Sequence, residues 1–525
     1  MRIEAGGYIN RAVETFGHRT AITGPQGSLS FTDLNGNGNQ IGSGLVRSGL
    51  ARGDRVAVLS YNRIEVAELW IGLEKHNLVR VVMHSHFDMA VHVATLNQVE
   101  ASALIFDTKF TAMVDAHRSN LKTVKLLVAI GPNPPPWAES YEAVRDSGSP
   151  HNPCLDVDED QPNFLQLTTG TTGNPKPWIA TFRSWRSVIQ ANAEHFDTFG
   201  EGIPAITHHD VNLHFHPLQW ATGFQTLFPY FLRGARTVLL DDEIFDPVAI
   251  VRTIAEEKVT GLFTPGPMLT PILDEVEKHG DIKGLIRRLM VFIATPEQLN
   301  RTTKLLGPVW AHGFGSTEQG APSTRLTHTE AAEKPGRIGS VGRVISPYHE
   351  IRIADERGDK VGHGEVGEII VRSPMSSSSY WKMPEQTANA FFPGDWFRPR
   401  DVGYIDADGF LFYLDRAKDC ITTAQGIVYP HTVESALQTH SAVANCGVVG
   451  ITNGNGQEIV GAILLKSETI GSDGLAAEIL ALAKSHLKSY EVPARLVFIK
   501  DLPTVLGGAK VQRDVLQRQL LEAGS

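Results

Sequence analysis

The sequence lacks the features that mark several classes of protein. Its three cysteines lie far apart in 525 residues without a C-x-x-C pair, so neither a disulfide framework nor a zinc site is indicated. It has no apolar run of about 18 residues and no apolar signal region at its start, so we expect no membrane insertion and no secretion. A net charge of −10 argues against a nucleic-acid partner. These absences favour a cytoplasmic enzyme.

The length and the order of segments indicate fold class. A chain of 525 residues is too long for one compact core, so two or more domains are expected. Apolar residues recur at helical spacing in Phe31–Leu50 and Glu65–Leu73, whereas Arg55–Ser60 and Val79–Met83 resemble buried strands. Alternating strands and helices predict an α/β protein with doubly wound, largely parallel sheets.

Residues 167–176, Leu-Thr-Thr-Gly-Thr-Thr-Gly-Asn-Pro-Lys, have the composition of a phosphate-binding loop. Glycine lets backbone N–H groups turn toward an anion, and threonine hydroxyls and a lysine add donors and charge. This is not a Walker loop, because Gly173 lies three residues before Lys176 and Pro177 follows it. A polar surface turn is the alternative for a random Gly/Thr run. The candidate phosphate-binding residues are Thr168, Thr169, Gly170, Thr171, Thr172, Gly173 and Lys176.

The order T-T-G-T-T-G-x-P-K resembles the phosphate loop of the adenylate-forming enzymes, which include acyl-CoA synthetases, luciferases and peptide-synthetase adenylation domains. At least five ordered motifs extend the resemblance over roughly residues 20 to 515. It implies a large N-terminal domain, residues 1–415, with mixed, doubly wound sheets and a small barrel-like part. A small mobile α+β domain, residues 416–525, would carry the catalytic lysine.

The segment Ala311–Glu318 resembles the aromatic-G-x-T-E motif of this family. The resemblance implies that Phe314 and Gly315 lie against adenine or the acyl group and that Thr317 bonds phosphate. Glu318 would hold Mg²⁺, which prefers one or two carboxylates plus phosphate oxygens. A helix N-terminus is the alternative for Thr-Glu alone.

Three further motifs complete the nucleotide site that the resemblance implies. Asp401 would accept the ribose hydroxyls, although the family's preceding Thr-Gly is Pro399-Arg400 here. In D-R-x-K-D, Arg416 would bind ribose or phosphate and Lys418 would be the hinge. Lys510 follows a Gly-rich loop with one extra residue and would be the catalytic lysine, a solvated lysine being the alternative.

The acyl pocket is implied by two segments. Residues 211–223 occupy the place of a family strand and aromatic motif, and residues 293–297 resemble the G-A-P segment, where Thr295 would line the nucleotide site. His214 and His216, at i and i+2 without a third ligand, favour strand residues over a metal site. For Trp220, the alternative is a tryptophan that packs in the core. The predicted pocket residues are Trp220, Gly223, Phe224, Ala294 and Phe314.

The resemblance implies ATP and Mg²⁺ as cofactors and a bulky, apolar or cyclic carboxylic acid that is activated as acyl-AMP. The acceptor is less determined, because Ala424-Gln425 stands where many acyl-CoA synthetases have a glycine turn by the thiol tunnel. This predicts capture by an amine, as in the coronafacic acid–amino acid ligases, with His431 as a candidate base and an exposed loop His as the alternative. An acyl-CoA synthetase is the second hypothesis, and a silent nucleotide-binding relative is the third.

Overall fold

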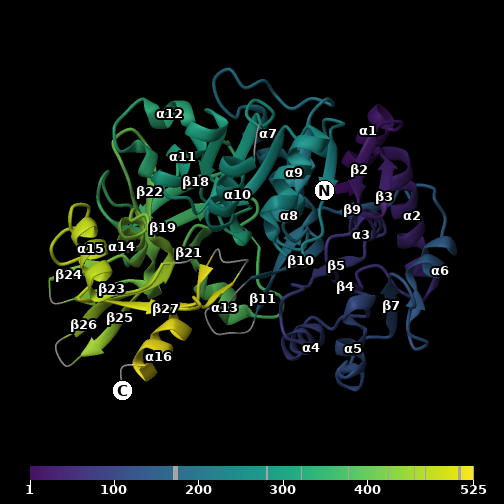
Figure 1. Cartoon of the computed structure of the whole chain (residues 1–525). Helices are drawn as coiled ribbons and strands as arrows, with labels where there is room; N and C mark the ends of the chain where they lie inside the picture. The colour runs from purple at the N-terminus through teal and green to yellow at the C-terminus, as the bar shows by residue number, and fades with distance from the viewer. Residues whose placement is uncertain are drawn as a thin grey trace.

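The structure is a computed structural model that describes residues 1–168, 175–279, 282–320, 322–376, 378–423, 425–453, 456–467, 469–505 and 510–523. Two large sheets with covering helices form the body of the molecule, and the C-terminal elements gather at one end of it (Figure 1). No described helix is long and apolar enough to cross a membrane.

The first large sheet has seven strands in the order β11-β10-β5-β4-β6-β7-β8. All neighbours are parallel except β11, which pairs antiparallel with β10. The strands are β4 (Arg55–Leu59), β5 (Val79–Val82), β6 (Ala103–Asp107), β7 (Leu126–Ile130), β8 (Glu139–Ser140), β10 (Pro162–Thr168) and β11 (Lys176–Thr181).

Helices cover both faces of this sheet, which explains the continuous apolar runs of its strands. Side chains of α2 (Phe31–Arg47), α3 (Ile64–Lys75) and α6 (Tyr141–Asp146) pack on one face. Side chains of α4 (Met89–Gln98) and α5 (Thr111–Asp115) pack on the other.

The second large sheet has eight strands in the order β17-β16-β15-β14-β12-β13-β2-β3, antiparallel only at its two edges. The helices α9 (Pro247–Glu257), α10 (Gly266–His279) and α11 (Pro296–Leu306) pack on one face, and α7 (Phe182–Asp197) and α8 (Ala221–Phe231) on the other. The strands are β2 (Thr20–Gly24), β3 (Gly27–Ser30), β12 (Val211–His214), β13 (Arg236–Leu239), β14 (Gly261–Pro265), β15 (Arg288–Phe292), β16 (Trp310–Gly313) and β17 (Leu326–Thr327).

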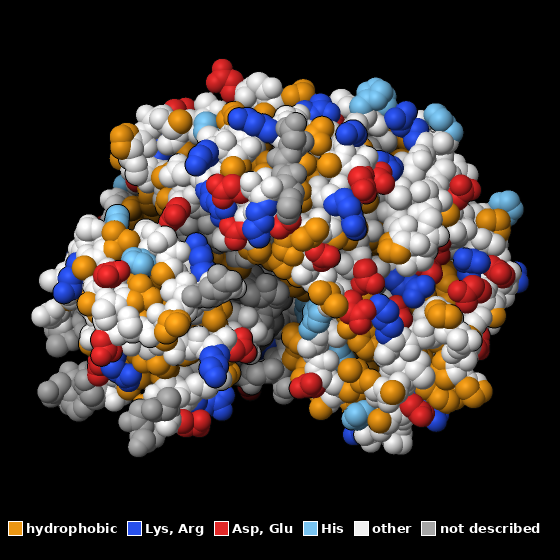
Figure 2. Space-filling view, in the orientation of Figure 1, with side chains coloured by type: hydrophobic (Ala, Val, Ile, Leu, Met, Phe, Trp, Pro, Cys, Tyr) orange, Lys and Arg blue, Asp and Glu red, His pale blue; other side chains and the backbone are white. Residues whose placement is uncertain are grey.

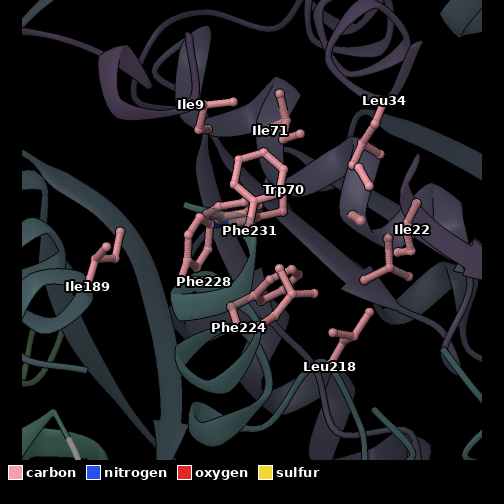
Figure 3. Packing of buried hydrophobic residues seen from close by; sticks show 14 of the residues in the cluster. Ile9, Ile22, Leu34, Trp70, Ile71, Ile189, Leu218, Phe224, Phe228 and Phe231 are labelled. Carbon is pink, nitrogen blue, oxygen red and sulfur yellow. The ribbon is translucent and has the colours of Figure 1, made fainter. Parts of the chain in front are cut away.

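An aromatic core joins the two large sheets. Trp70 of α3 lies against Phe224 and Phe228 of α8, with ring centroids 4.9 and 4.0 Å apart. Figure 3 shows these rings together with Phe231, Leu218 and aliphatic side chains from the first helices and strands. Large aromatic side chains bury much apolar area, so this cluster stabilises the relative position of the sheets.

A smaller antiparallel sheet follows, and it is the barrel-like part. Its strands are β18 (Glu350–Ala354), β19 (Gly367–Arg372), β20 (Phe391–Phe392), β21 (Trp396–Ile405) and β22 (Leu411–Arg416).

The C-terminal elements build their own core around β25 (Val443–Asn453), β26 (Gly456–Leu465) and β27 (Arg495–Ile499). The helices α14 (Pro430–Leu437), α15 (Asp473–Lys484) and α16 (Arg513–Ala523) pack around these strands. Two short hairpins complete this part, formed by β23 (Ile421–Thr423) with β24 (Gly426–Val428) and by β28 (Thr504–Val505) with β29 (Lys510–Val511).

The predicted fold class is confirmed. The four segments predicted near the start of the chain correspond to α2, β4, α3 and β5, with ends that differ by a few residues. The division of the chain at residues 415 and 416 stays a prediction.

Candidate active site

The two ends of the predicted phosphate loop are held by a hairpin. Thr168 at the end of β10 pairs with Lys176 at the start of β11, and the Thr168 hydroxyl donates to the Lys176 carbonyl at 3.3 Å. Thr169, Gly170, Thr171, Thr172 and Gly173 lie outside the described residues. Both ends of the loop are therefore positioned by the edge of the first large sheet.

Tyr380 brings Lys176 and Glu318 together. Its hydroxyl donates to Glu318 Oε1 at 3.0 Å, and the Lys176 ammonium lies 5.6 Å from its ring centroid. The Ser316 hydroxyl donates to the other Glu318 oxygen at 3.0 Å, so both carboxylate oxygens are oriented. Burial, followed by the charge of Glu318, raises the pKa of Tyr380, which keeps the phenol protonated as a donor.

The residues around Tyr380 run alongside β11, which explains its position. The Ile179 N–H donates to the Ser379 carbonyl at 3.0 Å, and the Trp381 N–H donates to the Pro177 carbonyl at 2.8 Å. The motifs in the sequence give Tyr380 no part in binding or catalysis. The only signal for it is tertiary pairing with residues about 200 positions earlier, which a pattern search along the chain does not reveal.

Thr317 opens a short 3-10 helix, Thr317–Gln319, directly before the partly exposed Glu318. Glu318 could hold a cation, because its carboxylate is partly exposed and oriented by two hydroxyls. Among the described residues there is no group of three or more His, Cys, Asp or Glu side chains that could hold a metal ion.

Asp401 and Arg416 face each other across two strands of the small sheet. They are register partners on β21 and β22, and Arg416 Nε lies 3.2 Å from Asp401 Oδ1. Asp401 is only 4% exposed, and its charge is the main cause that raises the pKa of Arg416. A nucleotide could exchange this ion pair for its own hydroxyls and phosphates.

The replacement of the family's Thr-Gly by Pro399-Arg400 leaves Asp401 in the sheet. Arg400 has a φ of 66°, a left-handed conformation that glycine adopts more readily. Its guanidinium donates to the Asn389 carbonyl at 2.7 Å, which holds the residue in place. The strand register shifts just before Asp401, so these residues form a bulge rather than a break.

We call Lys176, Glu318, Tyr380, Asp401 and Arg416 the nucleotide side. The charge of Glu318 also raises the pKa of Arg416, so the carboxylate and the guanidinium influence one another. The side chains of Glu318, Tyr380, Asp401 and Arg416 are thus held by charged or hydrogen-bonding partners, and the Lys176 ammonium lies over the Tyr380 ring. Thr295, predicted to line this site, caps α11 with its hydroxyl, which accepts from the Gln298 N–H at 3.3 Å.

The predicted pocket residues fall into two groups. Trp220, the residue before α8, is partly exposed, as are Ala221 and Thr222 after it. Phe224 instead packs in the aromatic core on Trp70, with the Arg80 guanidinium 4.5 Å from its ring. Gly223 is required by the turn before α8, because a Cβ there would lie 2.2 Å from the Leu218 carbonyl oxygen.

A chain of ring contacts connects Trp220 to the predicted G-A-P segment. His216 lies 6.0 Å from Trp220 and 5.0 Å from Phe263, and Phe263 lies 5.4 Å from Phe292. Ile293 follows with its side chain 52% exposed. Phe314 is buried next to Tyr413, with ring centroids 6.0 Å apart, and Gly315 after it is partly exposed.

His312 holds Ala294 in place, a role that the sequence analysis does not predict. The Ala294 N–H donates to His312 Nε2 at 3.4 Å, and His312 Nδ1 lies 3.3 Å from the Ser340 carbonyl, to which it donates. Burial lowers the pKa of His312 to about 4, so the ring is neutral and can accept and donate at once. We call Trp220, His216, Ala294 and His312, with residues 217–219, the acyl side.

The C-terminal elements meet the rest of the chain beside β22. The His431 N–H donates to Asp415 Oδ2 at 2.6 Å, and its ring lies 5.8 Å from that of Tyr413. Arg513 binds both oxygens of Glu434, at 2.7 and 3.0 Å, and lies 3.8 Å from Asp415. The backbone of Lys510, three residues before Arg513, therefore lies in a strand close to this boundary.

Lys418, the predicted hinge residue, lies between the two parts and forms ion pairs with Asp419 at 3.7 Å and Asp514 at 3.4 Å. Figure 2 shows a hollow at the lower centre of one face of the molecule. The C-terminal elements border it on one side, and the region of α4 and α5 borders it on the other.

The chain is similar to known proteins both in sequence and in structure. Residues 9–381 match the family model described as AMP-binding enzyme, and residues 432–506 match the one described as AMP-binding enzyme C-terminal domain. The chain is 29% identical over 526 residues to an indoleacetate–CoA ligase of Aromatoleum aromaticum, which covers 99% of this chain and 98% of that protein.

Solved structures agree in fold. The anthranilate CoA ligase AuaEII in complex with anthranoyl-AMP superposes with a TM-score of 0.88 at 23% identity, over 99% of this chain and 98% of that one. The amide bond synthetase McbA from Marinactinospora thermotolerans has a TM-score of 0.83 at 24% identity, over 98% of this chain and all of the other. At these identities the likeness shows the fold alone.

Proposed function

The chain belongs to the AMP-binding enzyme family, and on that premise we propose that it activates a bulky, apolar acid as acyl-AMP and passes the acyl group to an amine. The first step is supported by the Lys176–Tyr380–Glu318 arrangement at the ends of the predicted phosphate loop. The Asp401–Arg416 ion pair is coupled to this arrangement, because the charge of Glu318 raises the pKa of Arg416.

In the proposed first step a carboxylate oxygen attacks the α-phosphorus of ATP, and the bond from that phosphorus to the β-phosphate bridge breaks. Acyl-AMP forms and pyrophosphate leaves. The reactants repel each other because both are anionic, so catalysis needs fixed positive charge and donors. Lys176 and Arg416, with Lys510 and the predicted loop residues, would supply them.

Magnesium, when bound, would neutralise phosphate charge, and Glu318 would hold it. The hydroxyls of Tyr380 and Ser316 aim both oxygens of that carboxylate and leave room for a further ligand on each. Such supporting hydrogen bonds orient a ligand before the metal arrives.

The acid is proposed to be aromatic or otherwise cyclic. The partly exposed Trp220 and Ile293 border the acyl side, and apolar pockets select by buried area and shape. Two similar proteins, named for indoleacetate and anthranilate, act on aromatic acids. Acetate or a free α-amino acid as the best substrate would contradict this part of the proposal.

The amine acceptor rests on the hairpin of β23 and β24. Gln425 is exposed there, on a turn where a thiol tunnel would favour glycine; its neighbour Ala424 lies outside the described residues. A rotation about Lys418 would bring this hairpin toward acyl-AMP. The amine nitrogen would then attack the acyl carbon, AMP would leave, and the nitrogen would lose a proton to a base. His431 stays a prediction for that base.

Coenzyme A is the second candidate acceptor, because relatives that match most of the chain are CoA ligases, including the indoleacetate–CoA ligase. The deciding experiment incubates the enzyme with ATP, Mg²⁺ and an aromatic acid, with CoA alone, with an amino acid mixture alone, and with both. Mass spectrometry should find an amide whenever amino acids are present. Rapid acyl-CoA formation without amide would assign the chain to the CoA ligases instead.

Gln425→Gly, with the exposed Ile427→Gly as a matched change on the same hairpin, tests the role of the side chain. If the proposal holds, neither variant turns over CoA efficiently, because contacts for the CoA nucleotide would still be missing. Efficient CoA turnover by Gln425→Gly alone would show that only this side chain excludes the thiol.

A further inference from the structure

The acyl side contains buried polar side chains that have no hydrogen-bond partner in the described part of the chain. His216 is 0% exposed, and neither of its ring nitrogens has a hydrogen-bond partner among the described residues. Gln219 is 2% exposed, and its amide nitrogen and oxygen are also unpaired within the described part of the chain. Buried polar groups are nearly always satisfied, so each of these requires an explanation.

The backbone that carries both residues is firmly held. The Asn62 side chain donates to the His216 carbonyl at 2.9 Å and accepts from the Leu218 N–H at 2.8 Å. The Gln166 side chain donates to the Gln219 carbonyl at 3.2 Å. Three buried hydrogen bonds thus fix residues 216–219, while the side chains of His216 and Gln219 stay unpaired.

On the proposed function, this segment would lie near the end of the tail of the acid. Gln166 lies on β10, two residues before Thr168 at the phosphate loop, and Trp220 directly follows Gln219. The centroid of the His216 ring lies 6.0 Å from that of Trp220 and 5.0 Å from that of Phe263. His214 lies behind it, with ring centroids 4.0 Å apart. An acid whose carboxylate reaches the phosphate loop would direct its ring past Trp220 toward His216.

The charge state of these groups limits what they can bind. Burial lowers the pKa of His216 well below its usual range and that of His214 to about 3, so both rings are neutral. A neutral imidazole offers one donor and one acceptor, and a primary amide offers both kinds. A second carboxylate would lack a cation here, whereas a hydroxyl can donate and accept at the same time.

From this arrangement we infer that the preferred acid is aromatic and carries a hydroxyl at the end of its ring system remote from the carboxylate, bound by His216 and Gln219. The inference rests on the proposed function and narrows its substrate class. The Gln219 amide and the His216 imidazole would disfavour an acid with an apolar tail, because burying that tail would leave both groups without hydrogen bonds. The site would therefore combine an aromatic wall with a polar end.

The test uses pairs of acids that differ only by hydroxyl against methyl at the remote position. Suitable pairs are 4-hydroxy- and 4-methylphenylacetate, 4-hydroxy- and 4-methylcinnamate, and 6-hydroxy- and 6-methyl-2-naphthoate. ATP–pyrophosphate exchange gives kcat/KM for adenylation without any acceptor. We expect the wild-type enzyme to prefer the hydroxy member of at least one pair by about tenfold or more, as sites built to hydrogen-bond a hydroxyl do.

Two variants test whether His216 and Gln219 cause the preference for the hydroxy acid. Gln219→Leu, which preserves approximate volume, and His216→Leu should each reduce the hydroxy-to-methyl ratio by about tenfold. His195→Leu is the matched control, because His195 is another buried histidine on α7, outside the acyl side, whose ring nitrogens have no partner among the described residues. Its ratio should equal that of the wild type.

The outcomes separate the inference from the function beneath it. Exchange with equal or higher kcat/KM for every methyl acid would overturn the inference and leave acid activation standing. An unchanged ratio in both Leu variants would also overturn it. Absence of exchange with every acid in the panel would overturn the proposed function, and the inference with it. The wild-type pairs decide the question even if a Leu variant fails to fold.

Discussion

The polar groups of the nucleotide side and those of the acyl side differ in charge and in pairing. On the nucleotide side the groups are charged and paired: Asp401 with Arg416 at 3.2 Å, and Glu318 with the Tyr380 hydroxyl at 3.0 Å. On the acyl side the histidines are neutral, and His216 and Gln219 have no described partner. A charged group that is already paired can exchange its partner for a charge on the ligand. A neutral group without a described partner can instead form a hydrogen bond with the ligand.

On the proposed function, this difference would place the specificity for the acid on the acyl side. The phosphates and the ribose are the same for every enzyme that uses ATP. Charged residues that bind them can therefore be oriented in advance by pairing with one another, at a small cost in free energy. The acid differs from enzyme to enzyme, and its recognition depends on which buried groups lack a partner. The two sides can therefore be tested separately, by catalytic rate on one and by substrate preference on the other.

The largest expected effect comes from removing the charge predicted to complete the nucleotide side. Lys510→Ala should slow acyl-AMP formation by at least about a hundredfold, the usual scale for losing a group that stabilises transition-state charge. Pyrophosphate release measures the rate. Lys500→Ala, at an exposed lysine of the same part of the chain, is the control. A wild-type rate in Lys510→Ala would remove this lysine from the mechanism.

Glu318→Gln should raise the Mg²⁺ concentration needed for half-maximal adenylation by about tenfold to a hundredfold, because an amide is a poorer ligand for a hard cation. The comparison variant is Glu385→Gln, at an exposed carboxylate on α13 (Pro384–Asn389). Circular dichroism should show that both proteins are folded. If the Mg²⁺ titration of Glu318→Gln coincides with that of the wild type, Glu318 is not a ligand.

Four of the five residues of the nucleotide side could be chosen from the sequence because they lie in short motifs, and their roles stay predictions. Glu318, Asp401 and Arg416 each sit within a few residues of other motif positions, so order and spacing identify them. Tyr380 was missed because only the pairing of residues 379–381 with β11 brings its hydroxyl to Glu318. An isolated tyrosine in a loop has no periodic or motif signal of its own.

The acyl side was less predictable, because burial and not residue type decides its properties. Phe224, predicted for the pocket, packs in the aromatic core, and its spacing to Phe228 and Phe231 is the helical spacing of a buried face. The expectation that His214 and His216 are strand residues is confirmed for His214, which ends β12, and is wrong for His216, which lies in a bend two residues after that strand. That the ring nitrogens of His216 lack a described partner depends on residues distant in sequence, such as Phe263, which no local pattern reveals.

A smaller effect should follow from loosening Glu318 without removing it. Tyr380→Phe deletes the hydrogen bond to Glu318 Oε1 and should raise the Mg²⁺ requirement by up to about tenfold, the lower end for groups that orient a metal ligand. The matched control is Tyr348→Phe, at a partly exposed tyrosine. An increase in the acid KM with an unchanged Mg²⁺ requirement would place Tyr380 on the acyl side instead.

The smallest expected effect concerns pH and tests the neutrality of the acyl side. Burial disfavours the charged imidazolium and lowers the pKa of His312 to about 4 and that of His214 to about 3, so both rings stay neutral at every higher pH. The acid itself is ionised above pH 6. Its KM should therefore change by less than about twofold between pH 6 and pH 8, since an ordinary histidine would titrate in that range. A steep rise in KM toward pH 6 that disappears in His312→Asn would show that His312 gains a proton there. The acyl side would then respond to charge as the nucleotide side does, and the distinction between the two would fail.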